Sequence, residues 1–289
     1  MPLDIPDTVP THARRGIHWL VVAHVVVGVI AALLKRSAGS DFGWATAAYG
    51  GIYCGQICLL GIWSGLRATG PWNRLAGAVI GIVFLYLLQV LSYGELQIDL
   101  PIYLTVAVAF VATPFLIVRY IGIVISAVSV PITKAIHIQF AIRHLLILTF
   151  VVACVFSFGR VTQSFPSPQR EAIYIVICYA LMFIVVGVVP AWFMLATKWP
   201  VPYGIASVAI SACSGYCLGQ IINDPEVRIP VLAVVTATAL VVVASLYVVR
   251  RCGYRLVRLP KKTPRGSGLE EITTPHVSSQ DPHTSSLLP

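Results

Sequence analysis

Apolar residues occur along most of this chain in long runs that short polar segments separate. The runs are roughly 17 to 25 residues long, which is the length that a helix needs to cross a bilayer. Strands that cross an outer membrane would instead be about ten residues long, with alternating polarity. The pattern therefore predicts an all-α fold, a polytopic transmembrane helical bundle of about eight spans. The expected spans are Ile17–Leu34, Phe42–Leu66, Leu75–Leu91, Leu100–Val118, Leu145–Phe158, Ala172–Ala196, Val201–Ile222 and Ile229–Val249.

The composition supports a membrane protein. Hydrophobic residues make up 57% of the chain and charged residues only 11%. A soluble domain has about 25% charged residues, because its surface must be hydrated. The cysteines lie in or beside the apolar runs, where cysteine usually serves as a small hydrophobic residue. The sequence therefore does not predict a disulfide framework.

The midpoint of the chain, Ile136–Gly159, joins a basic, partly polar run directly to an apolar run. Between 136 and 142 the apolar residues alternate with polar or small ones, a period of two that disfavours a helix. We therefore expect an interfacial connector at this point. The expected division is a cytoplasmic N-terminal segment (1–16), a first four-span half (17–118), the connector (119–141), a second four-span half (142–249) and a cytoplasmic tail that is first basic and then disordered (250–289).

The two halves share a short similarity. The fourth span ends with Val118-Arg119-Tyr120-Ile121-Gly122, and the eighth ends with Val249-Arg250-Arg251-Cys252-Gly253. With four spans each, both halves would start and end on the same side of the membrane, as in transporters built from parallel repeats. A duplication and a chance match of a few residues are both open.

Lys and Arg set the expected orientation, because cytoplasmic loops carry an excess of them. With eight spans and the N-terminus inside, the inside segments carry more Lys and Arg than the outside loops, with or without the C-terminal tail. The acidic residues of the loops between spans fall outside. We therefore expect a multi-pass protein of the inner (cytoplasmic) membrane with both termini in the cytoplasm.

The segment Gln139–Thr149, QFAIRHLLILT, resembles the QFSIR-x-LL-x-LT segment that precedes a membrane span in many uncharacterised multi-pass proteins of planctomycete bacteria. The run Gln56–Trp63 and the Arg-x-x-Gly ends of the two halves are also similar to those proteins. Ala141 stands where that family usually has a serine, a residue that would be a plausible helix N-cap. The resemblance implies a location in a membrane and no particular activity.

Small residues recur at helical spacing in the second and seventh spans, and such ladders let helices approach closely. They are Gly43, Ala47, Gly51 and Gly55 in one span and Ser207, Ser211, Gly215 and Gly219 in the other. We expect these two spans to form a close helix pair. Each span also has two cysteines four residues apart on one helix face, Cys54 and Cys58 in one and Cys213 and Cys217 in the other. Four facing thiolates would bind a soft metal such as Cu(I) or Zn(II), although packing of small side chains is the better explanation for these cysteines.

His18 and His144 are the candidate pair for binding a haem, because both would lie near the cytoplasmic face on different spans. The alternative is interfacial anchoring and hydrogen bonding between helices, which also suits His24. No second full pair is evident, and no cofactor is predicted. Three buried amides are expected to bond between helices: Gln56, Gln89 and Gln220.

The basic run after the last span is expected to bind anionic lipid headgroups and to help fix the topology. It comprises Arg250, Arg251, Arg255, Arg258, Lys261 and Lys262. No aromatic-interleaved nucleic-acid-binding fold accompanies this charge. No nucleophile with a base and no phosphate-binding loop is evident, so an enzyme has no positive support.

The spans contain no Asp, Glu or Lys, which disfavours an ion-coupled carrier. The leading hypothesis is therefore a non-catalytic scaffold or interaction protein of the membrane. The alternatives are a carrier or channel for a small neutral or lipidic solute, and a haem or soft-metal redox protein.

Overall fold

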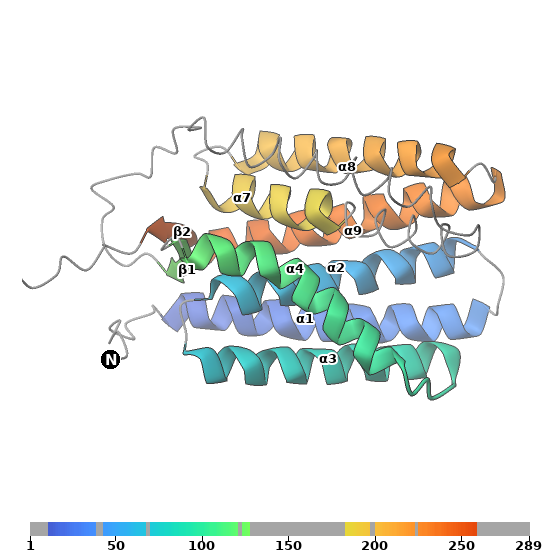
Figure 1. The fold of residues 1–289 in the computed structure, drawn as a ribbon, viewed down its shortest axis with the longest axis horizontal. Helices are drawn as coiled ribbons and strands as arrows, with labels where there is room; N and C mark the ends of the chain where they lie inside the picture. The colour runs from blue at the N-terminus through green and yellow to red at the C-terminus, as the bar shows by residue number, and fades with distance from the viewer. Residues whose placement is uncertain are drawn as a thin grey trace, which may run out of the picture. The chain divides into compact units, whose positions relative to one another are not determined.

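The computed structural model describes residues 11–38, 43–67, 70–120, 123–127, 183–196, 200–222 and 225–258. Over these residues the chain forms seven α-helices, one π-helix and one two-stranded sheet (Figure 1). Some predictions lie outside the described residues. They are the fifth span, His144, the segment 139–149, most of the connector 119–141, Lys261, Lys262 and the rest of the tail.

The first four predicted spans correspond to four long helices. These are α1 (Thr11–Ala38), α2 (Trp44–Leu66), α3 (Pro71–Tyr93) and α4 (Leu100–Tyr120). Pro71 starts α3, where its missing N–H is not needed by the helix. Gly94 ends that helix with a φ of 77°, a left-handed conformation that glycine adopts without strain.

The C-terminal part of the chain is described from Phe183 onward, with gaps at 197–199 and 223–224. It contains the π-helix η1 (Ile184–Val188), α7 (Val189–Ala196), α8 (Pro200–Ile222) and α9 (Pro225–Arg251). The wide π-turn lies just before Pro190. Proline has no N–H to bond to the carbonyl four residues earlier, so the preceding turn does not close as a regular α-helix.

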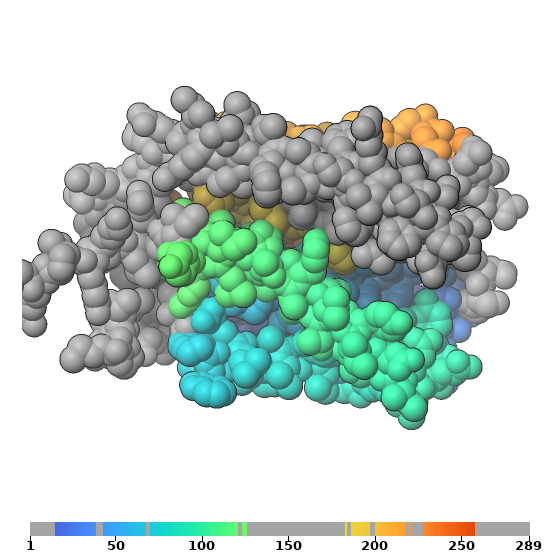
Figure 2. All heavy atoms as spheres, viewed as in Figure 1, coloured from blue at the N-terminus to red at the C-terminus, as the bar shows by residue number. Residues whose placement is uncertain are grey.

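Five helices of the described part are long and apolar enough to cross a membrane: α1, α2, α3, α4 and α9. The outward faces of α1, α3 and α4 carry many exposed aliphatic side chains, and Figure 2 shows the surface formed by α3 and α4. Exposed aromatic side chains mark the helix ends, with Trp44 77%, Trp72 79% and Tyr120 94% exposed. Tryptophan and tyrosine are enriched at the two membrane–water interfaces. The described part therefore has the surface of a membrane protein.

A short antiparallel sheet is the feature that the all-α prediction missed. Strand β1 (Ile123–Ala127) follows α4 and pairs with β2 (Tyr254–Arg258), which follows α9. β1 lies in the stretch predicted as an interfacial connector, and β2 in the basic first part of the predicted cytoplasmic tail. Neither five-residue strand has a partner close in sequence, so its backbone hydrogen bonds form only when the segments after α4 and α9 meet.

Helix α2 is the most deeply buried of the five long apolar helices. It packs against α9 on one side and α4 on another, and α9 in turn packs against α8 (Figure 1). Helices α2 and α8 correspond to the second and seventh predicted spans. The prediction that these two form the close pair was therefore wrong, since α9 is the principal neighbour of both.

Candidate functional site

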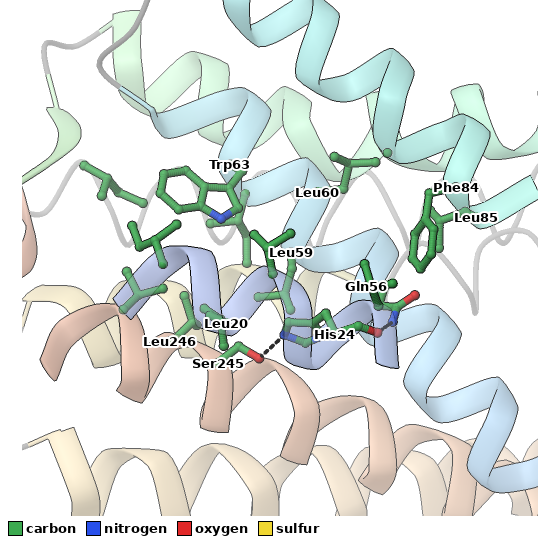
Figure 3. Close-up of a pocket in the computed structure, with 17 residues that line it drawn as sticks. Leu20, His24, Gln56, Leu59, Leu60, Trp63, Phe84, Leu85, Ser245 and Leu246 are labelled. Atoms are coloured by element: carbon green, nitrogen blue, oxygen red, sulfur yellow. Dashed lines mark hydrogen bonds between the residues drawn. The ribbon is translucent and has the colours of Figure 1, made fainter. Parts of the chain in front are cut away.

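A cavity of about 170 Å³ lies between α1, α2, α3 and α9, with one contribution from β1. Its walls are mainly aliphatic and aromatic, including Leu20, Leu59, Leu60 and Phe84 (Figure 3). None of its 17 lining residues is Asp, Glu, Lys or Arg. Val21 also lines the cavity, and it is 53% exposed on the outer face of α1. The cavity therefore reaches the surface that faces the surrounding lipid.

Three polar side chains line the cavity, each from a different helix: His24 from α1, Gln56 from α2 and Ser245 from α9. The Nε2 atom of His24 lies 2.8 Å from the Ser245 hydroxyl oxygen (Figure 3). Ser245 donates its hydroxyl hydrogen to the Val241 carbonyl at 2.6 Å. Since that hydroxyl has only one hydrogen, His24 must donate from Nε2. In the neutral ring, Nδ1 is then an acceptor.

Gln56 joins α2 to α1. Its Nε2 donates to the backbone carbonyl of His24 at 2.9 Å, which fixes the orientation of the amide group. Its Oε1 is buried and has no hydrogen-bond partner within the part of the chain that the structure describes. Gly28 makes this approach possible, because a Cβ at that position would lie 2.9 Å from Gln56 Nε2.

A second interhelical hydrogen bond lies about two turns before Gln56 on α2. Tyr49 of α2 donates to Gln89 Oε1 of α3 at 2.9 Å. Gln56 and Gln89 therefore form the interhelical hydrogen bonds that the sequence predicted for buried amides. Gln220 is exposed on α8, so the prediction of burial was wrong there.

The four cysteine candidates do not converge on one site. Cys58 is buried and Cys54 half-buried on α2, whereas Cys213 and Cys217 are exposed on α8. Helix α9 is the main neighbour of both helices. Among the residues that the structure describes, no group of three or more His, Cys, Asp or Glu side chains is placed to hold a metal. His18 is exposed on α1.

The small-residue ladders contact α9 from two sides. A Cβ on Gly51 would lie 2.3 Å from Ala237 Cβ, and one on Gly215 would lie 3.0 Å from Val235 Cβ. The remaining ladder members of the two spans differ in burial. Gly55, Ala47, Ser207 and Ser211 are buried, Gly43 is exposed, and the surroundings of Gly219 lie outside the described residues.

Two further glycines of α2 contact α4, and sequence reasoning did not single them out. A Cβ on Gly61 would lie 2.5 Å from Val111, and one on Gly65 would lie 2.5 Å from Phe115. Their four-residue spacing was the available signal. Ser245 was also missed, because one serine in a valine-rich run shows no pattern that would separate a hydrogen-bonding residue from a packing one.

Arginines gather at the end of the bundle where β1 and β2 pair. Arg67 caps the C-terminal end of α2, and its backbone forms an isolated parallel β-bridge with Ile125 of β1. Arg119 at the end of α4 donates to the Arg67 carbonyl, and Arg250 at the end of α9 donates to the Met194 carbonyl of α7 at 2.5 Å. Four more arginines lie in the helix termini and the strand at this end: Arg74, Arg251, Arg255 and Arg258.

The acidic residues of the described part, Glu95, Asp99 and Glu226, belong to the opposite ends of α3, α4 and α9. Lys35, Arg36 and Arg228 lie at these same ends, so the described charges there balance, whereas the end with β1 and β2 is strongly basic.

No protein-family model, curated protein sequence or solved structure matches the chain.

Proposed function

We propose that this is a multi-pass inner-membrane protein that acts as a carrier for a small neutral or lipidic solute, which it binds in the cavity between α1, α2, α3 and α9. The observation that supports this most directly is the cavity itself, which is mainly apolar, has no Asp, Glu, Lys or Arg in its lining and reaches the outer face of α1. Ligand sites of this kind combine apolar walls with a few polar groups that orient the ligand.

A bundle of eight spans in two similar halves fits this proposal. Helices α3 and α8 both have 23 residues and both begin with a proline, Pro71 and Pro200. In each half a tryptophan, Trp63 or Trp192, lies in the preceding helix, eight positions before that proline. The last helix of each half is then followed by a strand of five residues.

The contacts at the basic end also correspond between the halves. Arg119 links the end of α4 to the end of α2, and Arg250 links the end of α9 to the last turn of α7. The central residues of the two strands, Ile125 and Leu256, pair with each other. This register is the one that a two-fold axis between equivalent strands would produce. Parallel repeats of this kind occur in membrane transporters.

The difference in charge between the two ends supports an orientation with both termini in the cytoplasm, because arginine-rich segments stay on the cytoplasmic side. The basic residues at that end would also meet anionic lipid headgroups, each contributing about 1 kcal/mol near such a surface. Arg251 and Arg255 are exposed there and are the described residues best placed for this contact.

Binding of a small apolar probe to the cavity tests the proposal. The protein is reconstituted in lipid nanodiscs, and saturable binding of fluorobenzene is measured by fluorine NMR against empty discs. Gly81 lines the cavity and faces Leu60, so Gly81→Leu should fill the space and abolish binding. Gly77 lies one turn earlier on the same helix with nothing within 4 Å, so Gly77→Leu is the matched control. Equal binding by wild type and Gly81→Leu would refute the proposal.

A scaffold role is the second candidate, and the close glycine contacts between α2 and α9 favour it. A scaffold needs a rigid bundle and no solute. If it is the true function, Gly81→Leu should preserve the protein's cellular phenotype, while variants that separate α2 from α9 abolish it. A carrier would give the opposite result for Gly81→Leu.

We further propose that the protein works without a bound cofactor or metal. The absorbance spectrum and metal content of protein purified in mild detergent test this directly. A Soret band, or a stoichiometric metal that is lost on replacing His18, His144 or Cys54, would instead support the redox alternative.

A further inference from the structure

The unpartnered side-chain oxygen of Gln56 indicates which functional group the solute carries. We infer that the solute has an apolar body and one hydroxyl group, and that this hydroxyl donates a hydrogen bond to Gln56 Oε1. This inference rests on the proposed function, because it concerns the same cavity.

Gln56 is 7% exposed and lies in the middle of α2, between apolar neighbours. Its Oε1 accepts no hydrogen bond from the described residues, while its Nε2 donates one of its two hydrogens to the His24 carbonyl. A buried carbonyl oxygen without a donor is costly, and the lipid around the helices offers no water to satisfy it. A ligand that brings a donor into the cavity removes this cost.

The neighbouring polar groups offer acceptors rather than donors. The His24 Nε2 hydrogen is directed to Ser245, and the Ser245 hydrogen is directed to the Val241 carbonyl. The free position of the neutral imidazole is Nδ1, which is an acceptor. The indole N–H of Trp63 is a donor, but Trp63 is seven residues further along α2, about 10 Å away. Apart from the second hydrogen of Gln56 Nε2, the polar groups near Gln56 are therefore acceptors, and a ligand that donates would satisfy the buried Oε1.

The size of the cavity limits the apolar body. An apolar cavity of about 150 Å³ holds one benzene molecule, and this cavity has a volume of about 170 Å³. It therefore takes a single ring or an equivalent length of branched chain. The absence of Asp, Glu, Lys and Arg from its lining favours an uncharged solute.

Two probes of the same ring size separate the hydrogen bond from the apolar contact. The probes are 4-fluorophenol, which donates, and 4-fluoroanisole, which does not. Their saturable binding to the full chain in nanodiscs is measured by fluorine NMR and corrected for partition into empty discs. We expect the phenol to bind about tenfold more tightly, the usual worth of one hydrogen bond in a site of this kind.

Gln56→Met should remove this preference and retain binding of the ring, because methionine keeps the length of the side chain without its amide. Gln89→Met is the matched control, since Gln89 bonds to Tyr49 and does not line the cavity.

A measurement on the wild-type protein avoids dependence on the folding of the variant. With glutamine labelled at the side-chain nitrogen, the Gln56 amide signal should shift on adding the phenol and not on adding the anisole.

The outcomes separate the two proposals. Equal affinity for both probes in the wild-type protein would overturn the hydroxyl inference and leave the proposed function standing. A preference that survives in Gln56→Met, or a Gln56 signal that responds equally to both probes, would overturn the role of Gln56. Absence of saturable binding of either probe would overturn the proposed function together with this inference.

Discussion

The three polar residues of the cavity gain their roles from one another. Taken singly, each is a common side chain within an apolar run, and each side chain alone would be costly to bury in a membrane protein. Ser245 accepts from His24 only because its own hydrogen is directed to the Val241 carbonyl of its helix. This pair links α1 to α9, and Gln56 links α2 to the same residue of α1. His24 is therefore the residue through which three helices meet.

Replacing Ser245 by alanine should destabilise the protein, because the His24 N–H then loses its acceptor. Hydrogen bonds between membrane helices contribute about 0.6 kcal/mol on average and up to about 1.7. We expect Ser245→Ala to reduce the free energy of unfolding by about 1 kcal/mol more than Ser207→Ala. Ser207 is the matched control, because it is also buried and donates to a carbonyl of its own helix, Tyr203. Reversible unfolding in mixed detergent micelles measures both, and equal losses would show that the His24 contact contributes nothing.

At the scale of elements, α2 organises the described bundle through glycines placed on two faces. Gly51 and Gly55, in its first half, lie against α9, and Gly61 and Gly65, in its second half, lie against α4. Membrane helices gain little from burying apolar side chains, since lipid is equally apolar, so close backbone contact is what holds them together. The glycines of α2 provide that contact with two partners.

Gly51→Ala should therefore destabilise the bundle. The new methyl group would lie 2.3 Å from Ala237 Cβ and 3.1 Å from the Val234 carbonyl oxygen, so α2 and α9 must move apart. Overpacking of this kind costs about 1–3 kcal/mol. Gly77→Ala is the control, because nothing lies within 4 Å of the added methyl group, and its effect should stay within about 0.5 kcal/mol. Thermal unfolding in detergent compares the two, and similar midpoints would contradict the close contact.

The β1–β2 pairing is testable by disulfide formation. Ile125 and Leu256 are paired residues of the two strands, so Ile125→Cys with Leu256→Cys should oxidise readily to an intrachain disulfide. Ile123→Cys with Leu256→Cys is out of register and should react poorly. Mass spectrometry of the linked peptides measures both yields. Similar yields for the two pairs would argue against the register.

At the scale of the whole molecule, the uneven distribution of charge predicts how the chain crosses the membrane. Green fluorescent protein fused to the C-terminus should fluoresce, and alkaline phosphatase at the same place should be inactive, because the arginine-rich end stays in the cytoplasm. Leu96 is 73% exposed between α3 and α4, at the opposite end. Leu96→Cys should therefore react with an impermeant maleimide in intact spheroplasts, with the wild-type protein giving the background. An active phosphatase fusion, together with a Leu96→Cys variant that the maleimide does not label, would reverse the orientation.

The sequence by itself determined where the long helices lie, because a bilayer of fixed thickness imposes a run length that hydropathy reports directly. The described parts of the predicted spans agree closely with α1, α2, α3, α4, α8 and α9. The sequence also indicated that Gln56 and Gln89 would bond between helices, since a buried amide in a membrane has few other partners.

Only the tertiary structure decided which helices are neighbours, because a small-residue ladder shows that a face is closely packed but does not identify its partner. Both ladders contact α9, and the cysteines that resembled a matched set lie on two helices that each pack mainly on α9. The strand pairing and the cavity were also decided only by the tertiary structure. Each depends on residues brought together from distant parts of the chain, such as Ile125 with Leu256 and His24 with Ser245, and local periodicity carries no information about such contacts.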